Sequence, residues 1–301
     1  MSETETASPR CGLVAIVGRP NVGKSTLLNA LVGEKLSIVT DKPHTTRQRV
    51  LGVLNRGHDQ AVFIDTPGHA RRSTRVLHRL MARQIHQALE DCDVALLVVD
   101  AAKITSQDRA LIEVVRDKLD RTLLVLNKID TLASKTQLLP TLERLSDLPF
   151  AALMPVAAKN GDNLERLVEE VLTRLPHAPA LFPQGMVTDR DLAFRIAEII
   201  REKLMTLVHQ EVPYGLTVEV EHLGHNDEGQ RLVHAIVWVE REGHKKIVIG
   251  KAGAVLKQAG TLARQELRGL IGERVHLELW VKVREHWADN ERELTRLGFE
   301  V

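Results

Sequence analysis

Eight consecutive residues near the start of the chain combine the types that bind phosphate. They read Gly18-Arg19-Pro20-Asn21-Val22-Gly23-Lys24-Ser25, the G-x-x-x-x-G-K-S pattern of a phosphate-binding loop. The two glycines let the backbone curl so that its N–H groups point at phosphate oxygens, and the following helix adds its positive N-terminal end. Lys24 should reach the β- and γ-phosphates of a nucleotide, and the Ser25 hydroxyl should ligate Mg²⁺. An accidental glycine loop is the alternative, but the flanking strand and helix patterns favour a nucleotide site.

Two further segments carry side chains suited to the metal and the γ-phosphate. The first is Asp65-Thr66-Pro67-Gly68, which follows an apolar strand pattern. Asp65 should hold Mg²⁺ through water, and the Gly68 N–H should bond the γ-phosphate, although this short pattern alone also fits an ordinary turn. The second is the polar, proline-interrupted segment Asp41–Arg47, where nucleotide switches keep a threonine that ligates Mg²⁺. Taken alone, its Thr45-Thr46 pair fits an ordinary loop equally well.

The base is indicated by Asn127-Lys128-Ile129-Asp130, which follows a buried strand pattern. The Asp130 carboxylate can accept two hydrogen bonds from the N1–H and exocyclic amine of guanine. Adenine lacks this donor pair and would leave the buried carboxylate unpaired. Asn127 and Lys128 should brace the loop and cover the ring, and a backbone N–H of Val156-Ala157-Ala158-Lys159 could read the guanine O6. The pattern therefore predicts a guanine nucleotide.

A second glycine pattern lies in the C-terminal third of the chain. Val248-Ile249-Gly250-Lys251-Ala252-Gly253 opens a predicted helix, which is the signature loop of a KH domain. Between His244 and Leu270 there are six basic residues and one acidic residue, a local charge of +5. The glycines would let the backbone approach the phosphates of a single-stranded nucleic acid. A tight turn without a ligand is the alternative reading.

The elements that must position these residues alternate between strand and helix in the first 175 residues. Strand patterns cover 13–17, 48–55, 60–64, 94–100, 122–126 and 150–154, and helix patterns cover 26–31, 71–89, 108–119 and 163–175. This alternation predicts an α/β fold with a mostly parallel, doubly wound sheet. The ligand loops should then lie together at the carboxyl ends of the strands.

Prolines at 176, 179 and 183 indicate a linker. Beyond it, 192–208 and 254–270 read as helices, and 216–223, 232–240 and 275–283 alternate like half-buried strands. We therefore expect a disordered tail at 1–9, a GTPase domain at 10–178, a linker at 179–190 and a smaller α+β KH domain with a C-terminal extension at 191–301.

Composition sets the remaining bounds. A chain of 301 residues with 44% hydrophobic and 27% charged residues suits two ordinary globular domains. The net charge of +1 does not by itself indicate a nucleic-acid binder. Cys11 and Cys92 match no metal or redox spacing, which fits a reducing cytosol. The sequence shows neither a signal-peptide pattern at residues 1–9 nor an apolar run of membrane-spanning length. We expect a cytoplasmic monomer.

Together these motifs resemble the GTPase superfamily, and the phosphate loop with Thr45-Thr46-Arg47 resembles its branch of bacterial ribosome-assembly and tRNA-modification GTPases. A GTPase domain joined to a KH domain resembles the Era family of small-subunit assembly GTPases. The resemblance runs from Leu13 to Val301 and includes Arg201-Glu202-Lys203-Leu204, Glu211-Val212-Pro213-Tyr214, the segment 277–283 and Trp287.

The resemblance implies GTP hydrolysis coupled to binding of single-stranded RNA at the 3′ end of 16S rRNA in the 30S subunit. It also implies a type II KH domain, GTP/GDP and Mg²⁺ as ligands, and a cytosolic pool with some peripheral attachment to the inner membrane. By position, Thr46 resembles the switch threonine on Mg²⁺, and Asn21 resembles an asparagine that holds K⁺ in related GTPases. The RNA-binding candidates are Lys245, Lys246, Ile249, Gly250, Lys251, Ala252, Gly253 and Lys257.

The sequence departs from the family pattern in two places. Ala157-Ala158-Lys159 replaces the usual S-A-K, so a serine hydroxyl is missing, and no glutamine follows Gly68 to orient the attacking water. His69 stands after Gly68, as in translation elongation GTPases, where this histidine helps to orient the water; a solvated loop histidine is the alternative. The catalytic candidates are thus Lys24, Thr46 and His69.

Two other functions stay open at this point. The chain could be an RNA-binding placement factor in which nucleotide only switches affinity and hydrolysis is negligible. It could also be a tRNA-modification or tethering GTPase, which is disfavoured because no Cys, His or flavin-type site accompanies the G domain.

Overall fold

The computed structural model describes residues 8–68, 75–209 and 212–300. Contacts group the chain into two compact units. The first unit comprises Met1–Ser37, Thr46–Arg71 and Met81–Asp189, and the second comprises Ile38–Thr45, Arg72–Leu80 and Arg190–Val301. Most of the expected N-terminal tail, residues 1–7, lies outside the described residues.

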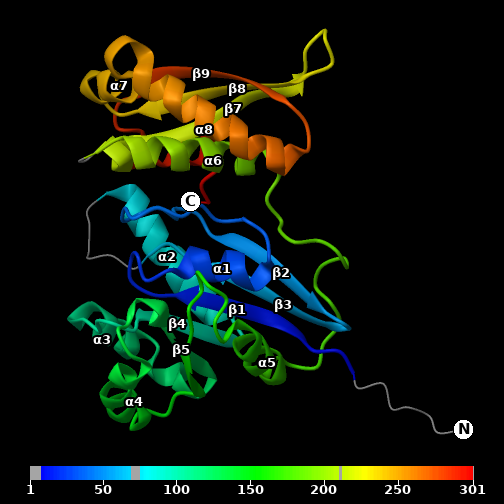
Figure 1. Ribbon diagram of the computed structural model, residues 1–301, viewed down its shortest axis with the longest axis vertical. Helices are drawn as coiled ribbons and strands as arrows, with labels where there is room; N and C mark the ends of the chain where they lie inside the picture. The colour runs from blue at the N-terminus through cyan, green and yellow to red at the C-terminus, as the bar shows by residue number, and fades with distance from the viewer. Residues whose placement is uncertain (1–7, 69–74, 210–211, 301) are drawn as a thin grey trace, which may run out of the picture. The chain divides into compact units, whose positions relative to one another are not determined.

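The first unit contains a six-stranded sheet in the order β2-β3-β1-β4-β5-β6 (Figure 1). The strands are β1 (Cys11–Val17), β2 (Val50–Arg56), β3 (Asp59–Asp65), β4 (Val94–Asp100), β5 (Thr122–Asn127) and β6 (Ala152–Pro155). β2 pairs antiparallel with β3, and all other pairs are parallel. This pairing confirms the predicted mostly parallel sheet. The apolar runs of β1, β4 and β5 are buried on both faces, as is usual for parallel strands.

Helices cover both faces of this sheet. α1 (Lys24–Val32) and α5 (Leu164–Arg174) pack on one face, and α2 (Val76–Asp91) and α3 (Ser106–Val114) contribute Ile85, Leu89 and Leu111 to the core on the other. α4 (Leu139–Ser146) and the short 3-10 helices η1 (Arg116–Arg121), η2 (Ile129–Thr131) and η3 (Lys135–Leu138) complete the unit. This double winding places the strand-to-helix loops at one edge, as parallel connections require.

Several predicted boundaries in this unit are wrong; the strand expected from residue 48, for example, begins at Val50. The helix expected over 108–119 ends at Val114, and the chain continues as η1, in which Lys118 has a non-helical backbone with φ −131° and ψ 15°. This break lets the chain turn back into β5, and the Thr122 hydroxyl donates to the Lys118 carbonyl at the turn. The strand expected from residue 150 begins at Ala152.

The second unit is a three-stranded sheet with helices on one face. Its elements are α6 (Leu192–Leu207), η4 (Val212–Gly215), β7 (Leu216–His225), β8 (Arg231–Val239), α7 (Glu242–Ile249), η5 (Lys251–Gly253), α8 (Ala254–Ile271), β9 (Val275–Val283), η6 (Trp287–Asp289) and α9 (Glu291–Arg296). β7 and β8 are antiparallel, and β8 and β9 are parallel. α6 and α8 pack through an apolar core that includes Ile200, Val237 and Ala263, which confirms the predicted α+β class.

Within the described residues, no helix has the length and apolarity needed to cross a membrane.

Candidate functional site

Most of the predicted nucleotide-binding segments follow carboxyl ends of neighbouring strands in the first unit; the exception is the segment 41–47, which precedes β2. The phosphate loop follows β1, Asp65-Thr66-Pro67-Gly68 ends β3, Asp100 ends β4, Asn127-Lys128-Ile129-Asp130 ends β5 and the segment 156–159 follows β6. Because these strands are parallel neighbours, their carboxyl ends meet along one edge of the sheet, where α/β folds bind ligands.

The phosphate loop is built so tightly that two of its glycines admit no side chain. A Cβ at Gly18 would lie 2.5 Å from the Val98 carbonyl oxygen. Gly23 has φ +95°, and a Cβ there would lie 2.4 Å from the Asn127 side-chain nitrogen. Asn21 also has a positive φ, of 64°. The loop backbone is therefore tightly curled, as a phosphate-binding loop requires.

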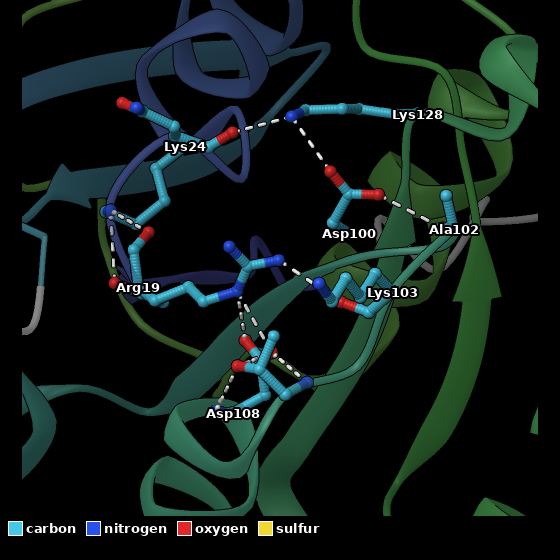
Figure 2. Close-up of polar contacts among 10 residues, drawn as sticks. Arg19, Lys24, Asp100, Ala102, Lys103, Asp108 and Lys128 are labelled. Carbon is cyan, nitrogen blue, oxygen red and sulfur yellow. Dashed lines mark hydrogen bonds and ion pairs between the residues drawn. The ribbon is translucent and has the colours of Figure 1, made fainter. Parts of the chain in front are cut away.

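Lys24 is buried at the start of α1 and points back into the loop. Its ammonium donates to the carbonyl oxygens of Gly18 and Arg19, each at 3.1 Å (Figure 2). Burial lowers the pKa of Lys24 to about 8, while the carboxylate of Asp65 opposes the lowering and Arg19 adds to it. Phosphate oxygens beside the ammonium would favour its charged form again, so nucleotide and lysine stabilise each other.

Three oxygen-bearing side chains gather beside Lys24. The Ser25 hydroxyl lies 2.8 Å from both the Thr46 hydroxyl and Oδ2 of Asp65, and Thr46 donates to the same Oδ2 at 3.3 Å. Asp65 is fully buried, and among the described residues its Oδ1 has no hydrogen-bond partner. Burial raises the pKa of Asp65, although Lys24 and the hydroxyls oppose the rise. Hard oxygen donors and a buried, unsatisfied carboxylate oxygen suit Mg²⁺.

The segment after β3 lies directly against the phosphate loop. A Cβ at Gly68 would lie 2.9 Å from Cα of Pro20, so only glycine permits this approach. The buried Thr66 hydroxyl donates to the Ile16 carbonyl at 2.8 Å and ties the segment to β1, and Pro67 is buried beside it. His69 lies outside the described residues.

Asn127 connects three loops. Its side-chain nitrogen donates to the Val22 carbonyl at 2.9 Å, and its Oδ1 accepts from the Ala158 N–H at 3.0 Å. Lys128, in a left-handed conformation, donates to the Asn21 carbonyl at 2.6 Å and to Asp100 at 2.9 Å (Figure 2). Both residues thus brace the loops around the expected base position.

The remaining base-loop candidates lie on either side of this brace. Ile129 is buried and donates its N–H to the Val156 carbonyl at 3.2 Å, whereas Asp130 is exposed. Ala157 is fully buried in the apolar core, so a methyl occupies the place of the missing serine hydroxyl. Lys159 is exposed.

Two aspartates near the phosphate loop were not among the sequence candidates. Asp100 holds Lys128, and the fully buried Asp108 holds Arg19. A usable signal was present for Asp108, because Thr105-x-x-Asp108 before an apolar run is a capping-box pattern. The ion pair of Asp108 with Arg19, 89 positions earlier in the chain, could not be predicted from sequence spacing.

The second glycine loop joins α7 to α8 in the second unit. Gly250 has φ +75°, and a Cβ there would lie 2.5 Å from Cγ2 of Val255. Ala252 and Gly253 also have positive φ values, 51° and 77°. Lys251 and Ala252 are exposed, and Ile249 is half-buried before the turn. The loop therefore presents its backbone at the start of the 18-residue helix α8.

Four lysines surround this loop. Lys245 is half-buried, and Lys246, Lys251 and Lys257 are exposed. In the part of the chain that the structure describes, no hydrogen bond or ion pair engages their ammonium groups. Unpaired cations beside an exposed backbone turn suit an anionic ligand such as a phosphate backbone.

Comparisons with known proteins cover both units. Residues 13–128 match the family described as 50S ribosome-binding GTPase, and residues 211–288 match the KH domain family. The GTPase Era of Yersinia pestis (strain Pestoides F) is 43% identical over 300 residues, which is 99% of this chain and 98% of the relative.

Two solved structures are also similar over almost their whole length. A variant of Aquifex aeolicus Era bound to GDP·AlF4⁻ has a TM-score of 0.93 at 39% identity, with 97% of this chain and 100% of that chain covered. A complex of Era with MgGDPNP and nucleotides 1506–1542 of 16S ribosomal RNA has a TM-score of 0.92 at 39% identity, covering 97% and 99%. With both domains matched and 43% identity along 99% of its length, the chain belongs to the Era family of GTPases.

Proposed function

We propose that this protein binds and hydrolyses GTP with Mg²⁺ and binds single-stranded RNA at the 3′ end of small-subunit rRNA, acting in assembly of the 30S subunit. The observation that carries the proposal is the joint presence of two sites in one chain. One is the loop cluster at the sheet edge of the first unit, and the other is the basic glycine loop of the second. The Era complex with MgGDPNP and 16S rRNA nucleotides supports both halves.

In the proposed nucleotide site, backbone N–H groups of the phosphate loop hold the phosphates and Lys24 bonds the β- and γ-phosphates. Gly68 offers its N–H to the γ-phosphate, Asp130 accepts from guanine, and a backbone N–H of the segment 156–159 reads O6. The tight contacts of Gly68 with Pro20 and of Asn127 with Val22 support this arrangement, because they bring the phosphate and base segments together.

In the proposed metal site, Ser25 and Thr46 ligate Mg²⁺ directly, and Asp65 does so through water. Bound Mg²⁺ neutralises charge on the β- and γ-phosphates. The protein supplies the rest: it buries Lys24 beside the phosphates, orders Thr46, and excludes bulk water by close loop packing. His69 is the candidate for orienting the attacking water, and Asn21 is the candidate for a K⁺ ion.

In the proposed RNA site, the phosphate backbone runs against Gly250, Lys251, Ala252 and Gly253, while Ile249 supports the turn. Lys245, Lys246 and Lys257 neutralise neighbouring phosphates. Glycines without side chains permit close approach, and unpaired lysines release counterions on binding, which gives affinity with strong salt dependence.

Coupling between the sites has a physical route in the second unit. The segment 38–45, which directly precedes Thr46, is held on α6. Lys42 donates to the carbonyls of Met205 and Val208, Glu202 accepts from the Val39 N–H at 2.9 Å, and the buried Arg201 donates to the Thr45 carbonyl at 2.5 Å. A change in the position of Thr46 when Mg²⁺ and γ-phosphate bind would therefore also change the conformation of a segment that is anchored in the RNA-binding unit.

We place the GTPase domain at residues 10–178, the linker at 179–190 and the KH domain at 191–301. We further propose a cytoplasmic monomer with peripheral attachment to the inner membrane, as the family resemblance implies. Sedimentation with vesicles of inner-membrane lipids tests the attachment, and the protein remaining entirely in the supernatant would exclude it.

Single-turnover hydrolysis of GTP tests the enzymatic half against the placement-factor alternative. Hydrolysis abolished by the Lys24→Ala change supports a GTPase, and a wild-type rate equal to that of GTP alone supports the alternative. Crosslinking the protein to cellular RNA and sequencing the footprint tests the RNA half: enrichment at the 3′ end of small-subunit rRNA supports it, and a tRNA footprint contradicts it.

A further inference from the structure

Arg19 is the one cationic side chain inside the phosphate-loop motif besides Lys24, and it points out of the loop. Its Nε lies 3.0 Å from both carboxylate oxygens of Asp108, and its Nη2 donates to the Lys103 carbonyl at 3.2 Å (Figure 2). The Arg19 side chain is 20% exposed and that of Asp108 is 0% exposed. The pair is thus largely shielded from solvent, where charge-assisted hydrogen bonds are strongest.

Asp108 is held rigidly by the start of α3. Its Oδ2 accepts from the Thr105 N–H and from the Thr105 hydroxyl, each at 2.7 Å, and the Asp108 N–H donates back to that hydroxyl at 3.4 Å. This capping box fixes the carboxylate independently of Arg19. The carboxylate is therefore a fixed anchor, and Arg19 is the group that it holds.

The anchor acts on the same loop atoms that hold the catalytic lysine. Lys24 donates to the Arg19 carbonyl. Two residues further along the loop, the Asn21 carbonyl accepts from Lys128, which is itself paired with Asp100. The outer turn of the phosphate loop is thereby tied to the segments that follow β4 and β5 (Figure 2). A loop held in its binding geometry loses less conformational entropy when phosphate binds.

We propose that Asp108 is a positioning residue of the nucleotide site: through its ion pair with Arg19 it holds the phosphate loop in the conformation that binds the nucleotide. The inference rests on the proposed function, since it assigns a support to that same site. Asp108 itself does not touch the nucleotide, and it acts through Arg19.

The test measures dissociation of fluorescent mant-GDP by stopped flow from the full-length wild type, Asp108→Asn, Arg19→Gln and the double variant. Each single change should speed dissociation about tenfold, because a misplaced loop weakens every phosphate contact. The double variant should be no faster than the single ones, because both changes break the same link. The matched control is Asn290→Ala, which removes the side-chain cap of α9 and leaves both Thr105 and the ion pair intact; it should lower the Tm and change dissociation less than twofold.

Three results would overturn the proposal: wild-type dissociation in both single variants, additive effects in the double variant, or an effect of Asn290→Ala as large as that of Asp108→Asn. If Asp108→Asn does not fold, Arg19→Gln decides alone, and an unchanged rate for that variant overturns the proposal. Failure of the proposed function is a different result, namely that the wild-type protein does not bind mant-GDP.

Discussion

At the scale of single residues, Asp130 is the group that we propose selects the base. It is exposed in η2, shortly after β5 and beside the Asn127 and Lys128 braces. Asp130→Asn should weaken GTP binding by about 3 kcal/mol or more, because two charge-assisted hydrogen bonds to guanine are lost. The amide should also favour xanthosine nucleotides, since xanthine presents a carbonyl where guanine presents a donor. Titration with both nucleotides measures the switch.

The control for this prediction is Lys24→Ala, which should weaken guanine and xanthine nucleotides alike because we expect the lysine to contact the phosphates and not the base. Unchanged GTP affinity in Asp130→Asn would contradict the guanine assignment.

His69 is the second residue whose role a single substitution decides. If its imidazole orients the attacking water, His69→Ala should lower kcat by roughly 100-fold while GTP affinity stays nearly constant. Single-turnover hydrolysis and mant-nucleotide binding, measured on the same preparation, separate the two quantities. A rate within about threefold of wild type would assign His69 to a solvated loop instead.

What the sequence predicts at this scale depends on where a residue's partners lie. Lys24 donates to two carbonyls of its own motif, and Gly23 takes a positive φ within the turn that the motif itself forms, so the motif alone predicted them. The roles of Asp100 and Asp108 depend on Lys128 and Arg19, which are 28 and 89 positions away. Such pairs arise only when the sheet brings two strand ends together, and spacing along the chain does not encode them.

At the scale of elements, the glycine loop between α7 and α8 is the part whose ligand can be tested without touching the nucleotide. The double change Lys251→Asp and Ala252→Asp spares both glycines. It also places aspartate at φ +51°, a conformation that aspartate adopts more readily than alanine does. RNA binding should weaken by roughly tenfold or more, and the salt dependence should flatten because Lys251 no longer releases a counterion.

Filter binding to a 3′-terminal fragment of small-subunit rRNA at two salt concentrations measures this. The charge-matched control is Arg292→Asp with Thr295→Asp, which makes the same charge change on exposed positions of α9 and should leave RNA binding near the wild-type value. GTP hydrolysis without RNA should not change in either variant. If wild type and the loop variant gave the same RNA-binding curves, the loop would be a structural turn that binds no RNA.

The elements also show where the pattern of apolar residues is sufficient to predict the bounds of a strand or helix and where it is not. The bounds of β4, β5, β8 and β9 were predicted within a residue or two. Their continuous or alternating apolar residues begin and end with the strand, so the pattern marks its bounds. The end of α3 was not, because Val115 and Leu119 stay buried through η1 and extend the apolar pattern beyond the helix. On α6, the buried Arg201 and Glu202 interrupt the apolar pattern, and each has, besides neighbours on the helix, a backbone partner more than 150 positions away.

At the scale of the whole molecule, the proline cluster correctly indicated that the chain does not form one core, since two compact units are found. Sequence did not predict that the segment 38–45 groups with the second unit. The reason is physical: this polar segment has no core pattern of its own, and it is held by backbone carbonyls at the end of α6 that no side-chain pattern reveals.

This anchoring leads to a prediction about the two ligands together. RNA should bind the GTP and GDP forms with affinities that differ by about 5-fold to 150-fold, the usual range of coupling between sites. By linkage, RNA must change the ratio of GTP to GDP affinity by the same factor, so the two titrations check each other. Lys42→Gln removes a cation from the carbonyls of Met205 and Val208. The Lys42→Gln change should bring the ratio of the RNA affinities of the GTP and GDP forms toward one, while nucleotide affinity without RNA stays unchanged. Equal RNA affinity in both nucleotide states of the wild type, at one fixed salt concentration, would leave a constitutive RNA binder and no switch.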